Sequence, residues 1–123
     1  MSLRSARASL MVALTNADID TYYGWGAFSA PCARVFPGEP WVEGGGGLAG
    51  GMRVQRWEVW AVAGRVDASA SFDELEDLVQ RINDAIEPLN EWSHVEWRRP
   101  AITTMSGTAY IACRGVIETR LEV

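Results

Sequence analysis

The chain has 123 residues, of which 48% are hydrophobic and 22% are charged, and its formal net charge is −5. This length and balance are typical of one globular domain with a single core, which excludes a disordered chain. The negative charge argues against a protein that wraps nucleic acid, because phosphate contacts require a basic surface.

The basic and aromatic residues indicate whether the chain contacts partner proteins. Lysine is absent, so every long basic side chain is arginine. Arginine is the preferred cation of interface ion pairs, although a genome rich in G and C produces the same bias without selection. Six tryptophans exceed what one small core needs. Some are therefore expected to face partner subunits; the alternative is an aromatic core with a few half-exposed rings.

The N-terminal residues superficially mimic a short export signal, with Arg4 and Arg7 before an apolar run. Leu3, Arg7, Leu10 and Leu14 fall on one side at helical spacing, however. This spacing predicts an ordinary helix from Leu3 to Asn16, and with it a cytoplasmic protein. No stretch approaches the roughly 20 apolar residues that a membrane helix requires.

The segment that follows the first helix reads as short extended pieces. Thr21 to Pro31 is aromatic, contains glycine and shows no period, which indicates an irregular segment or a short strand. Ala33 to Phe36 is a short strand that Pro37-Gly38 ends as a turn, and Trp41 to Glu43 is a second extended piece. Gly44 to Gly51 cannot bury enough apolar surface to fold alone, so we expect a flexible loop that orders only in an assembly.

One long strand, Met52 to Arg65, alternates well enough to be oriented. Trp57, Val59, Ala61 and Ala63 share one face, and Arg56, Glu58, Trp60 and Val62 share the other. The small alanines allow a helix to approach closely, which places the helices on the first face. The second face mixes charge with Trp60, and it suits a surface that is covered only on assembly.

The clearest element is an amphipathic helix that begins at Ser71. Ser71-Phe72-Asp73-Glu74 is a capping-box pattern, and the early acids favour the positive end of the helix dipole. Pro88 ends the helix. Its apolar stripe repeats at intervals of three and four residues and consists of Phe72, Leu75, Val79, Ile82, Ile86 and Leu89.

The C-terminal third predicts a hairpin. Ser93 to Arg99 and Thr108 to Leu121 are strands, with a turn at Thr104 to Gly107. Ile111, Cys113, Ile117 and Leu121 line the inner face of the last strand, with Arg114, Glu118 and Arg120 on the outer one. The order of elements predicts a single α+β domain over residues 1–123, a mixed or antiparallel sheet with two helices packed on one face.

No residues assemble into a catalytic site, and the chain is expected not to be an enzyme and to bind no cofactor or metal. Gly45-x-Gly47-x-x-Gly50 matches the dinucleotide fingerprint, but it precedes a strand when it should follow one. His94 is the only histidine and is expected on a strand surface. Cys32 and Cys113 allow one disulfide at most, and a buried, reduced Cys113 is expected.

Taken together, these elements resemble the tail terminator proteins of long-tailed bacteriophages. The resemblance runs through Ala33 to Trp41, Trp57 to Arg65, Phe72 to Ile86 and Gly107 to Arg114, as pattern and element order over nearly the whole chain. The absence of lysine fits the G and C rich phages of actinobacteria.

The resemblance implies a virion protein, assembled in the host cytoplasm, that forms a hexameric ring on the head-proximal end of the tail tube. Its partners would be other copies of itself, the tube protein and the head connector, and DNA would pass through the acidic lumen without specific binding. The pattern of residues alone predicts the interface positions, which are Trp41, Gly45, Leu48, Arg53, Arg56, Glu58, Trp60, Arg114 and Arg120. The alternatives are a neck or head-completion protein, a small ligand-binding α+β module and a host protein of unknown role.

Overall fold

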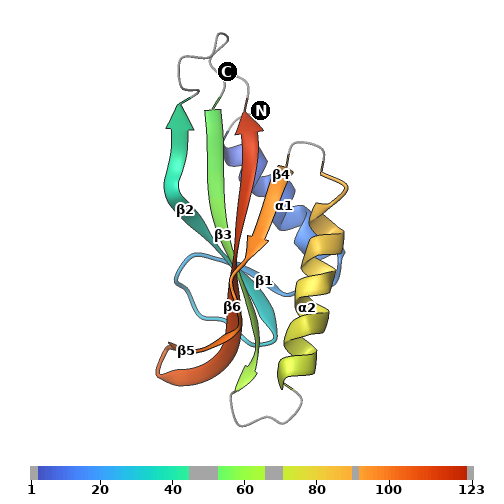
Figure 1. The fold of residues 1–123 in the computed structure, drawn as a ribbon, viewed down its shortest axis with the longest axis vertical. Coiled ribbons are helices and arrows are strands. Elements are labelled where there is room, and N and C mark those ends of the chain that lie inside the picture. Colours follow the sequence, from blue (N-terminus) through green and yellow to red (C-terminus); the bar gives the residue numbers. More distant parts are fainter. Residues whose placement is uncertain (1–2, 45–52, 66–70, 90–91, 122–123) are drawn as a thin grey trace.

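The computed structural model describes residues 3–44, 53–65, 71–89 and 92–121. Within these ranges, two helices and six strands follow one another (Figure 1). Their bounds are α1 (Leu3–Asn16), β1 (Thr21–Tyr23), β2 (Cys32–Gly44), β3 (Arg53–Arg65), α2 (Ser71–Ile86), β4 (Trp92–Trp97), β5 (Ala101–Met105) and β6 (Thr108–Leu121). Most of the glycine segment, residues 45–51, lies outside the described residues.

The strands form one six-stranded mixed sheet in the order β1-β2-β3-β6-β4, with β5 also paired to β6. β1 runs parallel to β2, and every other pair is antiparallel. β6 therefore pairs with β3 along one of its edges. Along its other edge, the first part of β6 pairs with β5 and the later part pairs with β4. The predicted α+β class is confirmed.

Both helices contribute to one core on a single face of the sheet. Leu10 and Leu14 of α1 and Ile82 of α2 are fully buried there. Alternate residues of β3 form the sheet side of this core, since Trp57 and Val59 belong to the same cluster. The predicted placement of the helices on the Trp57 face is therefore confirmed, as are the core positions Ile111, Cys113 and Ile117 of β6. The side chain of Leu121 lies outside the described residues.

The apolar stripe of α2 differs from its prediction at two positions. Leu75, Ile82 and Ile86 are buried as expected, but the Phe72 side chain is 56% exposed. Leu78, which the prediction left out, is buried. Phe72 occupies the first turn of the helix, so it lies at the edge of the core and not over it.

β2 and β5 also differ from the predictions. Pro37-Gly38 does not end a strand: β2 continues as one 13-residue strand whose pairing with β3 shifts between Pro37 and Val42. Glycine fits there because a Cβ on Gly38 would lie 2.8 Å from the Cβ of Arg56. Ala101–Met105 was not predicted as a strand, yet it forms the tight hairpin with β6 through the Ser106-Gly107 turn. Both turn residues have positive φ.

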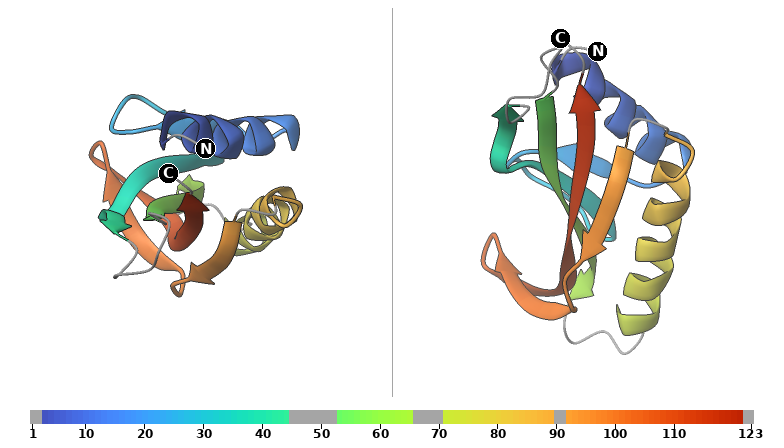
Figure 2. Two further views of the ribbon diagram at one scale, coloured as in Figure 1. Left: turned by 90° about the horizontal axis from the view of Figure 1, so that it is seen from above. Right: turned by 45° about the horizontal axis from the view of Figure 1, so that its top comes forward.

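The hairpin curls the sheet away from the helices at one end (Figure 2). A second, smaller cluster of Cys32, Val62 and Ala112 forms on that side, packed against Phe28, Trp60 and Tyr110 among others. Neither of the two described helices covers the rest of this sheet face. We call it the open face, the side of the sheet that bears Arg34, Glu58, Trp60 and Arg114.

A candidate interface on the open face of the sheet

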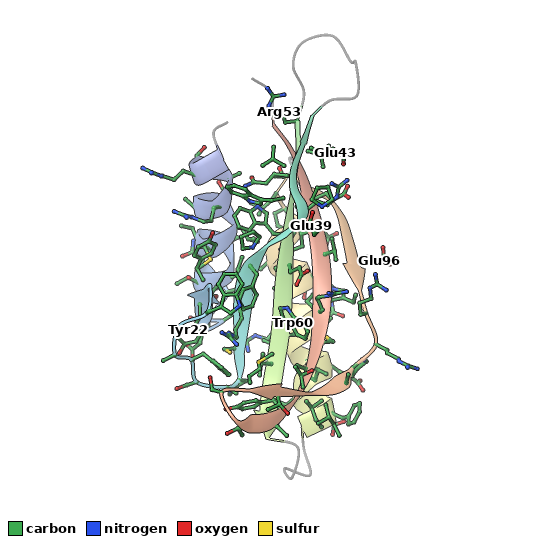
Figure 3. All side chains as sticks on the ribbon, turned by 90° about the vertical axis from the view of Figure 1, so that its left-hand side faces the viewer. Tyr22, Glu39, Glu43, Arg53, Trp60 and Glu96 are labelled. Atoms are coloured by element: carbon green, nitrogen blue, oxygen red, sulfur yellow. The ribbon has the colours of Figure 1, made fainter. Side chains whose placement is uncertain are left out.

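The structure divides the predicted interface residues into two groups. Arg56, Glu58, Trp60 and Arg114 lie together on the open face, with Trp60 near its middle, above the β5–β6 hairpin in Figure 3. Arg53 is exposed at the far end of the sheet from that hairpin, and strand alternation assigns it to the other face (Figure 3).

Three other predicted positions do not join the open face in the described structure. The Trp41 ring is 43% exposed and packs edge-on against Trp57, at 6.3 Å between centroids, so it belongs to the helix-covered side. Gly45 and Leu48 lie outside the described residues, as does the side chain of Arg120.

Arg56 is held by two carboxylates from neighbouring strands. Its Nη1 atom lies 2.7 Å from Oε2 of Glu43 on β2, and its Nε atom lies 2.9 Å from Oε1 of Glu118 on β6. The hydrogen bonds that the Arg56 guanidinium donates, first to Glu43 and then to Glu118, raise its pKa. The arginine therefore ties three strands of its own subunit together and is not free to pair with a partner.

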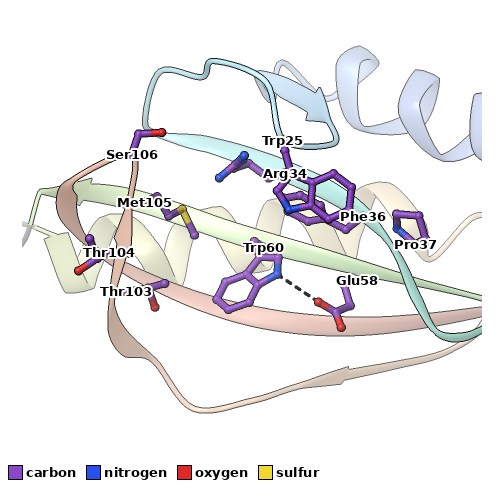
Figure 4. Close-up of a pocket in the computed structure, with 10 residues that line it drawn as sticks. All are labelled: Trp25, Arg34, Phe36, Pro37, Glu58, Trp60, Thr103, Thr104, Met105 and Ser106. Carbon is purple, nitrogen blue, oxygen red and sulfur yellow. Dashed lines mark hydrogen bonds between the residues drawn. The ribbon is translucent and has the colours of Figure 1, made fainter.

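Glu58 orients the central tryptophan of the open face. The indole Nε1 of Trp60 donates a hydrogen bond of 3.3 Å to Oε1 of Glu58, drawn as the dashed line in Figure 4. The other carboxylate oxygen of Glu58 lies 3.6 Å from Nη1 of Arg114. The Trp60 ring is thus held in one orientation, so it would lose little conformational entropy on binding a partner. Tryptophans of this kind are favoured at interfaces.

Arg34 is a functional candidate that the sequence reading missed. It is 7% exposed, and its guanidinium lies between the rings of Phe28 and Phe36, at 4.3 and 5.0 Å from their centroids. Nη2 donates to the carbonyl oxygen of Gly24 at 3.3 Å, and the buried Nε has no hydrogen-bond partner. No ion pair joins Arg34 to a carboxylate among the described residues. The burial arises from the segment after β1, which no periodic pattern could place.

Two open grooves flank Trp60. Groove 1 has a volume of about 550 Å³, and its lining includes Trp25, Arg34, Phe36, Trp60, Thr104 and Ser106 (Figure 4). Groove 2 has a volume of about 660 Å³, and its lining includes Trp60, Trp97, Arg98, Arg99, Thr103 and Arg114. The Trp25 ring is 82% exposed at the rim of groove 1, where it packs against Phe36. Trp25 was not among the predicted interface residues.

The remaining candidate groups offer little nucleophilic chemistry. Both cysteines are free and buried, on opposite sides of the sheet. Burial raises the pKa of each thiol from 9.0 to about 11; for Cys32, Arg34 offsets part of this effect and Asp20 adds to it. Within the described ranges, no group of three or more His, Cys, Asp or Glu side chains could hold a metal ion. No described helix is long and apolar enough to cross a membrane.

No protein-family model and no curated protein matches the chain. The geometry of the open face is therefore the basis for inferring a function.

Proposed function

We propose that this protein is a tail terminator: a subunit of a hexameric ring that caps the head-proximal end of a phage tail tube and joins it to the head connector. The observation that carries the proposal is the open face. It has a tryptophan held in place, arginines and two grooves, on a sheet whose two described helices pack on the other side. Such a surface is typical of one that is buried in an assembly.

The charge and size of the chain are consistent with this role. A net charge of −5 disfavours retention of DNA, so a ring of these subunits would let the genome pass through its lumen. A small α+β domain with one well-packed core supplies a rigid building block, and the open face is left to make contacts. The protein would act in the virion, with no enzymatic step.

Disruption of the gene in the phage that encodes it tests the proposal. Each exposed tube ring otherwise offers a template for the next, so loss of the cap should give filled heads without tails and tails of uncontrolled length in electron micrographs of the lysate. Tails of normal length that fail to join heads would support a neck protein instead. Normal virions would contradict both roles.

One feature favours a second candidate, a ligand-binding module. Groove 1 combines aromatic side chains with the buried Arg34, within the size range of small-molecule sites. Its openness to solvent and the exposed Trp25 at its rim favour a protein contact, however. Native mass spectrometry of the purified chain separates the two, because a module would carry a bound metabolite on a stable monomer.

A further inference from the structure

One helix of the subunit carries a concentrated negative charge. The helix α2 carries five acids, Asp73, Glu74, Glu76, Asp77 and Asp84, against the single base Arg81. Arg81 itself donates to the backbone carbonyls of Ala17 and Asp18, at 3.1 and 2.6 Å. The solvent side of α2 is therefore an acidic surface, and it lies on the opposite side of the sheet from groove 1.

Groove 2 has the opposite charge. Arg98, Arg99 and Arg114 line it, and no acid is among its described lining residues. In groove 1 the one carboxylate, Glu58, is already engaged by Trp60 and Arg114. Groove 2 therefore offers the cations of Arg98 and Arg99 to a partner, although the arginines Arg56 and Arg114 of the open face are paired with carboxylates of their own subunit.

Arg34 adds an independent observation that points to a carboxylate. A guanidinium that is more than nine-tenths buried is costly to maintain without an anion. The Nε atom of Arg34 has no partner, and its side chain lines groove 1 (Figure 4). A carboxylate that enters the groove would meet a donor already stripped of water, where a charge-assisted hydrogen bond is strong.

Each surface also exposes an aromatic side chain that its own subunit does not bury. Phe72 is 56% exposed in the first turn of α2, next to Asp73, and Trp25 is 82% exposed at the rim of groove 1. Exposed rings beside complementary charges are typical of the anchors of protein interfaces.

From these four observations we infer that the open face of one subunit receives the acidic surface of α2 from a second copy of this chain, and that a carboxylate of that helix binds Arg34. The two surfaces are different patches of the subunit, so the contact is head-to-tail and can repeat around a ring. Stacking two α2 helices would instead bring like charges together. The inference rests on the proposed ring and specifies which surfaces build it.

The mass of the purified full chain in sedimentation velocity, measured over a range of protein and salt concentrations, tests the inference. The wild type should assemble and should dissociate as salt rises. The helix variant D73R/E76R and the groove variant R98E/R99E should each remain monomeric, whereas E39R, a reversal at an exposed strand position outside both surfaces, should assemble normally.

Mixing the two defective variants gives the sharper result. Each retains one working surface, so a head-to-tail contact predicts that the mixture forms dimers and nothing larger. If the helix variant assembles like the wild type, or if the mixture stays monomeric, the inference is wrong.

Arg34→Met tests the buried cation separately. It should abolish assembly without lowering the melting temperature of the isolated subunit, because the residue it removes is a buried charge without an anion. Assembly that survives this substitution would contradict the role of Arg34. A wild type that is monomeric under all conditions would overturn the whole inference, while the tail terminator proposal would still be decided by the lysate experiment.

Discussion

Arg56 and Glu118 face each other across β3 and β6, and the arginine Nε lies 2.9 Å from the glutamate Oε1. Glu43 approaches the same guanidinium from β2. The sequence pattern had predicted both Arg53 and Arg56 as interface positions. The structure separates these two arginines, because Arg56 is engaged within the subunit.

The first prediction concerns this pair of arginines. Arg56→Glu should lower the free energy of unfolding by about 1–2 kcal/mol, since it replaces two partly exposed ion pairs by repulsion among three carboxylates. Arg53→Glu, at an exposed position, should change it by less than about 0.5 kcal/mol. Urea denaturation followed by tryptophan fluorescence measures both. Equal effects would mean that the Arg56 ion pairs contribute nothing.

The second prediction concerns the buried stripe of α2. Leu75→Ala and Ile82→Ala should each cost about 2–5 kcal/mol, because both side chains are essentially inaccessible and leave cavities. Phe72→Ala is the matched control on the same helix, and its cost in chemical denaturation should be only about 1 kcal/mol since the side chain is 56% exposed. A stable Ile82→Ala variant would show that the helix faces the other way.

The third prediction concerns Gly115, which lies beneath a tryptophan. A Cβ at Gly115 would lie 2.9 Å from the Trp97 ring, whose Nε1 donates to Asn83 Oδ1 on α2 at 2.8 Å. Gly115→Ala should therefore displace the ring and cost about 1–3 kcal/mol. Gly26→Ala, where a Cβ meets nothing, is the control. Thermal unfolding compares the two, and an unchanged melting temperature for Gly115→Ala would contradict the packing.

The fourth prediction concerns alkaline pH. Burial raises the pKa of Cys32 and Cys113 from 9.0 to about 11, so the folded state favours the neutral thiols. Their contribution to stability is complete below pH 9 and is lost as the pH rises towards 11, by about 1.4 kcal/mol per pH unit for each thiol.

Denaturation curves at pH 8 to 11 check this dependence. Over that range, the free energy of unfolding of the Cys32→Ala variant should fall less steeply than that of the wild type. The difference between the two slopes is the contribution of the Cys32 thiol. Identical slopes for the two proteins would show that the Cys32 thiol does not titrate differently in the folded and unfolded states.

Strong periodicity is what made much of this fold predictable. The bounds of α1 and β6 agree with the expectation residue for residue, and β3 and α2 agree closely, because their apolar positions repeat over many residues. β5 is too short for a period to show: its composition is rich in β-branched residues, which favours a strand, but it has five residues only and its Ile102 is 67% exposed. Pairing with β6 completes what the short segment alone does not reveal.

The candidate site was less predictable than the fold, for a physical reason. Alternation along β3 placed Arg56, Glu58 and Trp60 on one face, which needs only the strand period. The burial of Arg34 and the exposure of Trp25 depend on how the segment between β1 and β2 folds back over the sheet. No local pattern encodes that path, so both residues were missed.

The alternation along β3 also has a consequence for how this protein can change over evolution. Glu58 lies on the open face, whereas the neighbouring odd positions Trp57 and Val59 belong to the core beneath the helices. At this place in the strand, a residue that can set binding preference alternates with residues that stabilise the fold. A lineage could exchange Glu58 to follow a changing partner and keep the core beneath the helices intact.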